Sequence, residues 1–229
     1  MTNYSDIYNP DEGFDAYLSH ITAKKIKNEY LIRNNEILDI GAGTGIISKY
    51  FCKDNNISIV EKHDKYIDIL RKKFEPKNIY SQNFMSSNIS SFFDYIFIFN
   101  NIQEQKNIES FLIKASKNLS PNGSILLTYP NALSIHRIIA KGLGVINDVK
   151  SDKSENSKKY GDFHLLTKEK INDAVLAVNL KIKLEDGIFF KPFTNAMLEK
   201  LDEKKLNFFN SLSYIYPENC ALNFVEITR

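Results

Sequence analysis

Three alternating glycines and two carboxylates near the start of the chain have the types and spacing to hold a small polar ligand. Asp39 stands shortly before the first glycine of the run Gly41-Ala42-Gly43-Thr44-Gly45. Glycine lets a backbone approach a ligand closely, and a helix that starts after such a loop offers unpaired N–H groups. Glu61 follows further along the chain, at the end of another apolar run. We therefore expect a binding site that combines this loop with both acids.

Two phosphate-binding motifs can be compared with this loop, and neither fits. The dinucleotide fingerprint has glycine at its first, third and sixth positions, whereas the sixth position here is Ile46. The phosphate-binding P-loop ends in Gly-Lys-Ser/Thr, which this loop does not contain. A carboxylate at Asp39 repels pyrophosphate but accepts hydrogen bonds from an amine, and Glu61 can accept both hydroxyls of a ribose. A ligand with an ammonium group, a free ribose and no phosphate is S-adenosylmethionine.

Apolar runs and helical periodicities predict the elements that must position these residues. Residues 36–40 and 57–60 predict strands that end at the loop and at Glu61, and residues 46–51 predict a helix between them. Further elements are expected as strands at 78–81, 92–99 and 124–129, helices at about 64–74 and 108–119, and a turn at 120–123. This alternation predicts an α/β fold with a largely parallel sheet and helices on both faces.

The alternation loosens after residue 130. The patterns predict helices at 133–143, from Thr167 onward and at about 195–212, strands at 181–190 and 221–228, and a mobile polar loop at 147–162. We expect one domain over residues 1–229, made of an N-terminal helical cap (1–34), a cofactor-binding half (35–130), an acceptor-site insertion (131–178), and closing strands and helix (179–229).

Composition narrows the class of protein. The 30 basic and 28 acidic side chains leave a net charge of +2, which is too balanced to argue for nucleic acid. The chain has no uninterrupted apolar stretch long enough to cross a bilayer, so no membrane span is expected. Cys52 and Cys220 fit a reducing compartment, and the polar, acidic start of the chain does not resemble a signal peptide. We expect a cytoplasmic protein, and we expect no metal because neither CxxC nor HExxH occurs.

Four segments in order and in register resemble motifs of the class I S-adenosylmethionine-dependent methyltransferases: ILDIGAGTG, IVEKHD, FDYIFIFNNIQE and LSPNGSILLTYP. The resemblance covers about residues 30–130. It implies a Rossmann-like, doubly wound sheet of seven mostly parallel strands with the last strand antiparallel, S-adenosylmethionine as cofactor and S-adenosylhomocysteine as product. Residues 131–193 more loosely resemble small-molecule methyltransferases of bacterial surface-polysaccharide and secondary-metabolite pathways. That likeness rests on Asn131-x-x-Ser134-x-His136-Arg137, His164 and the run 187–192.

The resemblance also implies cofactor-binding roles. Asp39 and the backbone of Gly41, Ala42, Gly43 and Gly45 would hold the methionine part, and Glu61 would bind the ribose hydroxyls. The remaining contacts would come from Lys62 beside the adenine, Asn83 toward its amino group, Phe84 through its N–H and ring, and Asn100 at the methyl end. Asn83 departs from the family, which often has Asp there.

Several residues are candidates for binding or activating the methyl acceptor. The reaction expected is in-line methyl transfer to a hydroxyl or amine of a polar small molecule, with a sugar nucleotide or a surface-polysaccharide precursor as the guess from resemblance. A hydroxyl acceptor needs a general base, for which the candidates in order are His164, His136 and Glu104. Glu104 enters because the family frequently has Glu-His where this chain has Gln103-Glu104. Substrate-binding candidates are Tyr8, Arg137 and Lys191, the last two suiting an acidic acceptor.

Other functions compete with this interpretation. A non-catalytic nucleotide-binding or S-adenosylmethionine-binding module would keep Asp39 and Glu61 without the polar groups of the acceptor side. A nucleic-acid methyltransferase acting on exocyclic amines usually has Asn/Asp-Pro-Pro-aromatic after the fourth strand, where this chain has Asn100-Asn101-Ile102-Gln103. A nicotinamide oxidoreductase is disfavoured by Ile46.

Overall fold

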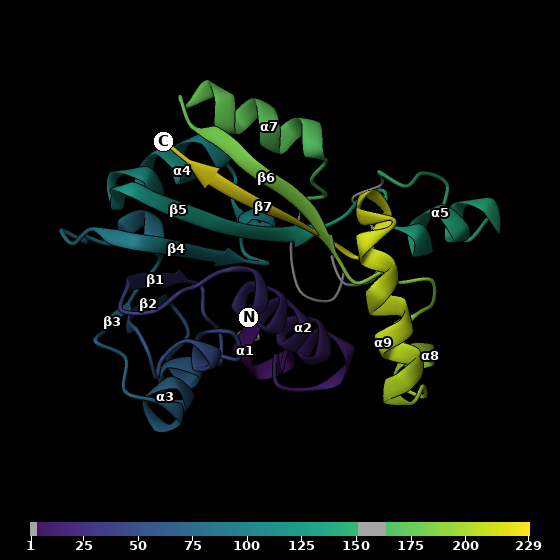
Figure 1. Cartoon of the computed structure of the whole chain (residues 1–229), viewed down its shortest axis with the longest axis horizontal. Helices are drawn as coiled ribbons and strands as arrows, with labels where there is room; N and C mark the ends of the chain where they lie inside the picture. Colours follow the sequence, from purple (N-terminus) through teal and green to yellow (C-terminus); the bar gives the residue numbers. More distant parts are fainter. Residues whose placement is uncertain (1–3, 151–163) are drawn as a thin grey trace.

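The computed structural model describes residues 4–150 and 164–229, and within them seven strands form one mixed sheet (Figure 1). The strands lie in the order β3-β2-β1-β4-β5-β7-β6. Their bounds are Glu36–Ile40 for β1, Asn56–Glu61 for β2, Asn78–Ser81 for β3, Phe93–Phe99 for β4, Leu119–Pro130 for β5, Lys181–Ile188 for β6 and Leu222–Thr228 for β7. Strands β1 to β5 are parallel to one another, and β7 is antiparallel to both β5 and β6. The predicted fold is confirmed.

Helices cover both faces of the sheet (Figure 1). The α-helices are α1 (Tyr4–Ile7), α2 (Gly13–Glu29), α3 (Asp64–Lys73), α4 (Ile108–Lys117), α5 (Ile135–Gly142), α7 (Lys168–Ala177), α8 (Asn195–Leu198) and α9 (Glu203–Ser211). Short 3-10 helices are η1 (Ser48–Tyr50), η2 (Phe84–Ser86), η3 (Ile102–Glu104), η4 (Leu212–Tyr214) and η5 (Pro217–Asn219). Helices α4 and α7 lie on one face, with α2 and α3 on the other.

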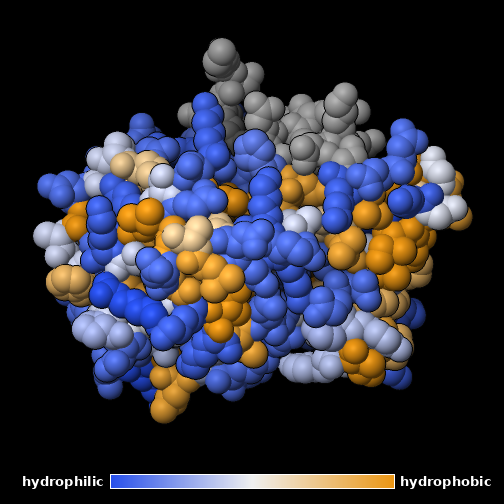
Figure 2. All heavy atoms as spheres, turned by 90° about the horizontal axis from the view of Figure 1, so that it is seen from above, coloured by the Kyte–Doolittle hydropathy of each residue, from blue (hydrophilic) through white to orange (hydrophobic). Residues whose placement is uncertain are grey.

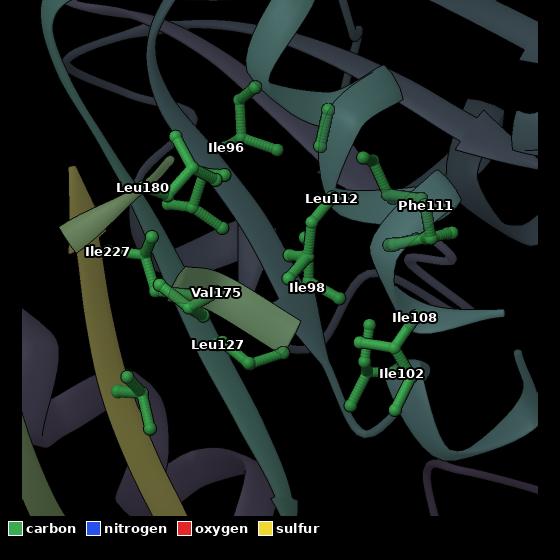
Figure 3. Packing of buried hydrophobic residues seen from close by; sticks show 14 of the residues in the cluster. Ile96, Ile98, Ile102, Ile108, Phe111, Leu112, Leu127, Val175, Leu180 and Ile227 are labelled. Carbon is green, nitrogen blue, oxygen red and sulfur yellow. The ribbon is translucent and has the colours of Figure 1, made fainter. Parts of the chain in front are cut away.

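The core consists of two apolar clusters, one on each face, because successive side chains of a strand point to opposite sides. On β4, Ile96 and Ile98 pack against Phe111 and Leu112 of α4 (Figure 3). Phe97, between them, belongs to the other cluster, which includes buried residues of α2 and α3. Burying each such side chain contributes about 1.5–3 kcal/mol. The edge of the sheet is therefore a rigid platform.

Two predicted helices and a predicted turn differ from the structure. The helix expected at 46–51 is only the 3-10 helix η1, and the Asn55 side chain donates to the Phe51 carbonyl just after it (2.9 Å). The helix expected at 195–212 is divided into α8 and α9, since Asp202 caps α9 by accepting from the Lys205 N–H (2.9 Å). The turn expected at 120–123 lies within β5, beside an irregularity in its pairing with β4.

The carboxyl ends of β1, β2, β4, β5 and β6 meet at one edge of the sheet, where α/β folds bind ligands. Most of the predicted mobile loop, residues 147–162, lies outside the described residues. Among the helices that the structure describes, none has the length and apolar character required to span a bilayer.

Candidate functional site

A cavity of about 410 Å³ opens at this edge of the sheet, within the size range of ligand sites. Its wall brings together fifteen of the sixteen residues that the sequence predicts: Tyr8, Asp39, Gly41, Ala42, Gly43, Glu61, Lys62, Asn83, Phe84, Asn100, Glu104, His136, Arg137, His164 and Lys191. Gly45 is the exception. Residues from the ends of five strands, far apart in sequence, thus share one site.

The glycine loop needs its glycines for two different reasons. Gly41 and Gly43 adopt φ angles of 73° and 56°, and a Cβ on Gly41 would clash with the side chain of Asn101. Gly45, with φ of 75°, would place a Cβ 2.6 Å from Leu70 of α3. Gly45 therefore lets the loop pack against α3, and its contact with the cofactor stays a prediction.

Asp39 is buried at the end of β1, with 3% of its surface exposed. The Ser48 hydroxyl donates to its Oδ2 at 2.5 Å. The pKa of Asp39 is raised to about 7, mainly by burial; the Ser48 hydrogen bond opposes this shift, and the charge of Glu61 adds to it. A cation beside this carboxyl would restore its ordinary acidity.

Glu61 is fixed at the end of β2 by three backbone donors. Its Oε2 accepts from Gly43 N–H at 2.9 Å, and its Oε1 accepts from the N–H groups of Lys62 (2.8 Å) and His63 (2.9 Å). Burial raises the pKa of Glu61, and these hydrogen bonds oppose the shift. The carboxylate is thus held in one plane at the cavity wall.

In the part of the chain that the structure describes, two buried side-chain oxygens shortly after β4 have no hydrogen-bond donor, and such acceptors suit a ligand with an ammonium group. Asn100 follows β4 in a left-handed conformation, with φ of 49°, which Asn tolerates better than most residues. Within the described residues its Oδ1 is buried without a hydrogen-bond partner, as is Oε1 of Gln103. Because buried acceptors require donors, these atoms, Asp39 and Glu61 match the ammonium and ribose hydroxyls of S-adenosylmethionine.

The predicted adenine end is partly occupied by internal contacts. Oδ1 of Asn83 accepts from Met85 N–H at 2.8 Å and so caps η2. The Phe84 ring is buried against Phe111, with ring centroids 5.1 Å apart. Lys62 Nζ lies 3.4 Å from Glu104 Oε2 across the cavity mouth. Glu104 therefore lies beside Lys62, which follows Glu61 in the sequence. Burial raises the pKa of Glu104.

The other end of the cavity is basic. His136 and Arg137 come from α5, and Lys191 follows β6. Burial, together with the positive charges of Lys191 and Arg137, lowers the pKa of His136 to about 3. His164 is exposed at the cavity wall, and its backbone N–H donates to Gln103 O at 2.9 Å. The two histidines therefore lie in different environments: His136 is half-buried beside positive charges, whereas His164 is exposed.

Tyr8 is the predicted site residue in the segment before α2, which covers the glycine loop through contacts that the sequence did not predict. Asp11 accepts from the Thr44 hydroxyl (2.7 Å) and pairs with Lys73 (2.8 Å). Tyr66 donates its hydroxyl to Tyr8 O at 2.8 Å. Gln103 and Asn131 are among the polar wall residues that were not predicted as site residues. In the sequence, only its acidic side chain could have drawn attention to Asp11, because its partners Thr44 and Lys73 lie far along the chain.

Comparisons with known proteins agree with this geometry. The model of the family described as "Methyltransferase small domain" matches residues 8–155. No curated protein matches the sequence. Similar solved structures include an S-adenosylmethionine-dependent methyltransferase from Mesorhizobium loti, with 11% identity, a TM-score of 0.66, and 95% of this chain and 100% of that chain covered.

Two further structures resemble the chain at similar levels. One is a methyltransferase from Thermotoga maritima described as a possible histamine N-methyltransferase (17% identity, TM-score 0.62, covering 93% of this chain and 88% of that one). The other is the plantazolicin methyltransferase BpumL in complex with S-adenosylhomocysteine (17% identity, TM-score 0.60, covering 99% of this chain and 88% of that one). At these identities the likeness shows the shared fold.

Proposed function

The chain belongs to the methyltransferase small domain family, and from this premise we propose that it methylates a hydroxyl or amine of a polar small molecule. It is an S-adenosylmethionine-dependent methyltransferase. The observation that carries the proposal is one cavity with two unlike ends: Asp39, Glu61 and the glycine loop at one, His136, Arg137 and Lys191 at the other.

The acidic end is assigned to the cofactor. S-adenosylmethionine supplies an activated methyl group on a sulfonium, so alignment and exclusion of water are the main tasks of the protein, and alignment alone can contribute about 7–11 kcal/mol. Asp39 and Oδ1 of Asn100 would accept from the ammonium group. Glu61, held by three N–H groups, would accept from the ribose hydroxyls.

His164 is the strongest of the three candidate bases. His136 has its pKa lowered to about 3, so its neutral ring is a poor proton acceptor. Glu104 is paired with Lys62 beside Glu61, away from the basic end. His164 is exposed, and its backbone is anchored to Gln103. A base at this position would accelerate transfer to a hydroxyl by about 10²–10⁴-fold.

The acceptor we favour is a sugar nucleotide or a surface-polysaccharide precursor. The polar and basic wall at the acceptor end supports a polar molecule. Two similar structures are named for plantazolicin and, as a possible substrate, histamine, and neither name specifies a nucleic acid. A non-catalytic module is less well supported, because it would not need the polar groups opposite Glu61.

Calorimetric titration with S-adenosylhomocysteine, with NAD as the control ligand, tests the cofactor assignment. We expect binding of S-adenosylhomocysteine alone. The purified protein would then be screened against sugar nucleotides, simple sugars and amines, with formation of S-adenosylhomocysteine as the readout. Binding of NAD alone, or turnover of nucleic acid but of no small molecule, would contradict the proposal.

A further inference from the structure

We propose that Glu104 recognises the adenine of the cofactor, by accepting a hydrogen bond from its 6-amino group through Oε1. This inference rests on the proposed function, which places the ribose at Glu61, and it adds a specificity-determining residue to that site. It gives a role to a carboxylate that the basic end of the cavity does not use, and it leaves Asn83 as a structural cap.

A ribose bound at Glu61 fixes where its base can lie. The carboxylate of Glu61 is held by three backbone N–H groups, one of which belongs to Lys62, so a ribose hydrogen-bonded to it lies at the end of β2. The base is attached to the same ribose. Lys62 and the side chain that Lys62 contacts therefore border the base.

Two aromatic rings line the cavity near this position. Strand β3 ends at Ser81, which pairs with Glu61, and η2 follows with Phe84. The rings of Phe84 and Phe111 of α4 lie 5.1 Å apart, and both residues line the cavity. Hydrophilic side chains predominate on the face of the molecule that Figure 2 shows, so this aromatic lining is a distinct environment. It suits a flat base, whose polar edge then needs polar wall residues.

The side chain of Asn83 is already engaged. Its Oδ1 accepts from Met85 N–H at 2.8 Å and so caps η2, and a second donor would have to share this oxygen. Its Nδ2 is a donor and cannot accept from an amino group. Asn83 is therefore a weaker candidate for the adenine amino group than a carboxylate with a free oxygen.

Glu104 has such an oxygen. Its Oε2 lies 3.4 Å from Nζ of Lys62, and among the residues that the structure describes Lys62 is the only one bonded to this carboxylate. An ionised carboxylate accepts several hydrogen bonds, so Glu104 can keep Lys62 and accept from the base through Oε1. Burial raises the pKa of Glu104, and Lys62 opposes the shift. A donor on the ligand would favour the charged form further.

The short helix η3 holds Glu104 in a fixed position. Ile102, at the start of η3, is fully buried and packs in the same cluster as Ile108 and Phe111 of α4 (Figure 3). The N–H of Glu104 donates to Asn101 O at 3.1 Å. A binding group on an anchored element is placed more precisely than one on a free loop, which suits a residue that distinguishes one base from another.

Calorimetric titration with S-adenosylhomocysteine and with S-inosylhomocysteine, which has a keto oxygen in place of the 6-amino group, tests the proposal. The keto oxygen would face Oε1 of Glu104, so the original chain should prefer S-adenosylhomocysteine by at least about tenfold. E104Q should reduce this preference to within about threefold, because an amide donates to a keto oxygen as well as accepting from an amino group. E104A, which removes the acceptor without adding a donor, should do the same.

Two further variants are the controls. E109Q, at an exposed acid of α4, and N83A should each keep the preference of the original chain. The ratio of two affinities is measured on one variant at a time, so a loss of stability, which weakens both ligands alike, cancels.

The outcomes separate this inference from the proposed function. A preference that persists in E104Q or E104A, or that is lost in N83A, overturns the role of Glu104. Loss of all binding in both Glu104 variants also overturns it, because Asp39 and Glu61 should still hold the rest of the cofactor. Equal binding of the two ligands by the original chain refutes the inference and leaves the proposed function standing. If the original chain binds neither ligand, both fail.

Discussion

Oε2 of Glu61 accepts a hydrogen bond from the backbone N–H of Gly43 at 2.9 Å. This bond joins the end of β2 to the loop that follows β1, so the two parts of the predicted cofactor site are positioned as a unit. Side chain and backbone fix each other here: the loop orients the carboxylate, and the carboxylate satisfies an N–H that lies beside a cavity. A change at Glu61 should therefore disturb both parts.

Glu61→Gln should weaken binding of S-adenosylhomocysteine by about 10- to 100-fold. An amide puts an NH₂ group against a backbone N–H, and hydrogen bonds to a charged acceptor are worth about 1.5–3 kcal/mol. Calorimetric titration measures the effect. Glu109→Gln, at an exposed acid of α4, is the matched control and should bind normally. Unchanged affinity in the Glu61 variant would disprove the ribose role.

Asp39→Asn should stabilise the unliganded protein at pH 8 while weakening S-adenosylhomocysteine binding. The pKa of Asp39 rises from 3.8 to about 7 in the folded protein, so its contribution to stability is present below about pH 4 and is lost as the pH rises through about 7. The amide avoids this loss, and we expect a gain of about 1–3 kcal/mol in the free energy of unfolding at pH 8. Urea unfolding at pH 5 and pH 8 measures it. A variant that is less stable than the original at both pH values would contradict the argument.

His164→Ala should lower turnover of a hydroxyl acceptor by about 10²–10⁴-fold and leave the affinity for S-adenosylhomocysteine within twofold. The side chain is exposed at the cavity wall, so its removal leaves the core intact. His20→Ala, at an exposed histidine outside the cavity lining, is the control. Full activity in the His164 variant would transfer the search for a base to other groups.

Gly45→Ala should destabilise the fold more than Gly144→Ala. Both glycines have positive φ, 75° and 70°, so both substitutions carry a backbone cost of about 1 kcal/mol. Only at Gly45 would the new Cβ meet other atoms, Leu70 at 2.6 Å and Phe74 at 2.9 Å, whereas Gly144 has open space. Overpacking adds about 1–3 kcal/mol. Thermal unfolding compares the two variants, and equal losses would refute the packing role of Gly45.

Thr44→Val should speed release of S-adenosylhomocysteine by about 3- to 30-fold. The variant loses the 2.7 Å hydrogen bond to Asp11 that ties the segment before α2 to the glycine loop, and it leaves a carboxylate oxygen with fewer donors. Stopped-flow measurement of dissociation gives the rate. Thr194→Val is a suitable control, because the side chain of Thr194 makes no capping bond to α8. A release rate in the Thr44 variant equal to that of the control would show that the segment does not retain the ligand.

Local patterns predicted the fold, and they placed the residues proposed for the cofactor at one edge of the sheet, because these residues are tied to strand ends. Asp39 and Glu61 each close a short apolar run, and parallel strands bring such ends to the same edge. The packing of Gly45 against Leu70 was not predicted, because glycine spacing does not distinguish a ligand contact from a packing contact. The break at Asp202 was missed because it depends on a single side-chain hydrogen bond.

The contacts of the acceptor side were less predictable because they join segments distant in sequence. Lys191 and His136 belong to different elements far apart along the chain, and their proximity depends on how α5 packs beyond β5. The apolar periodicity of α5 predicts a helix but not its orientation, and none of its residues is buried. Asp11 and Thr44 meet only after the segment before α2 folds back over the loop.

The position of β7 between β5 and β6 determines when the protein can finish folding during synthesis. Strand β5 emerges from the ribosome long before residues 222–228, and until then its second edge, with apolar residues such as Ile125 and Leu127, has no partner. Strand β6 waits for the same segment, beside which it lies in the sheet. Nascent chains that pause before residue 222 would expose two pairing-competent edges. Slow translation over residues 189–228 would therefore lengthen the time during which these edges can pair with other chains.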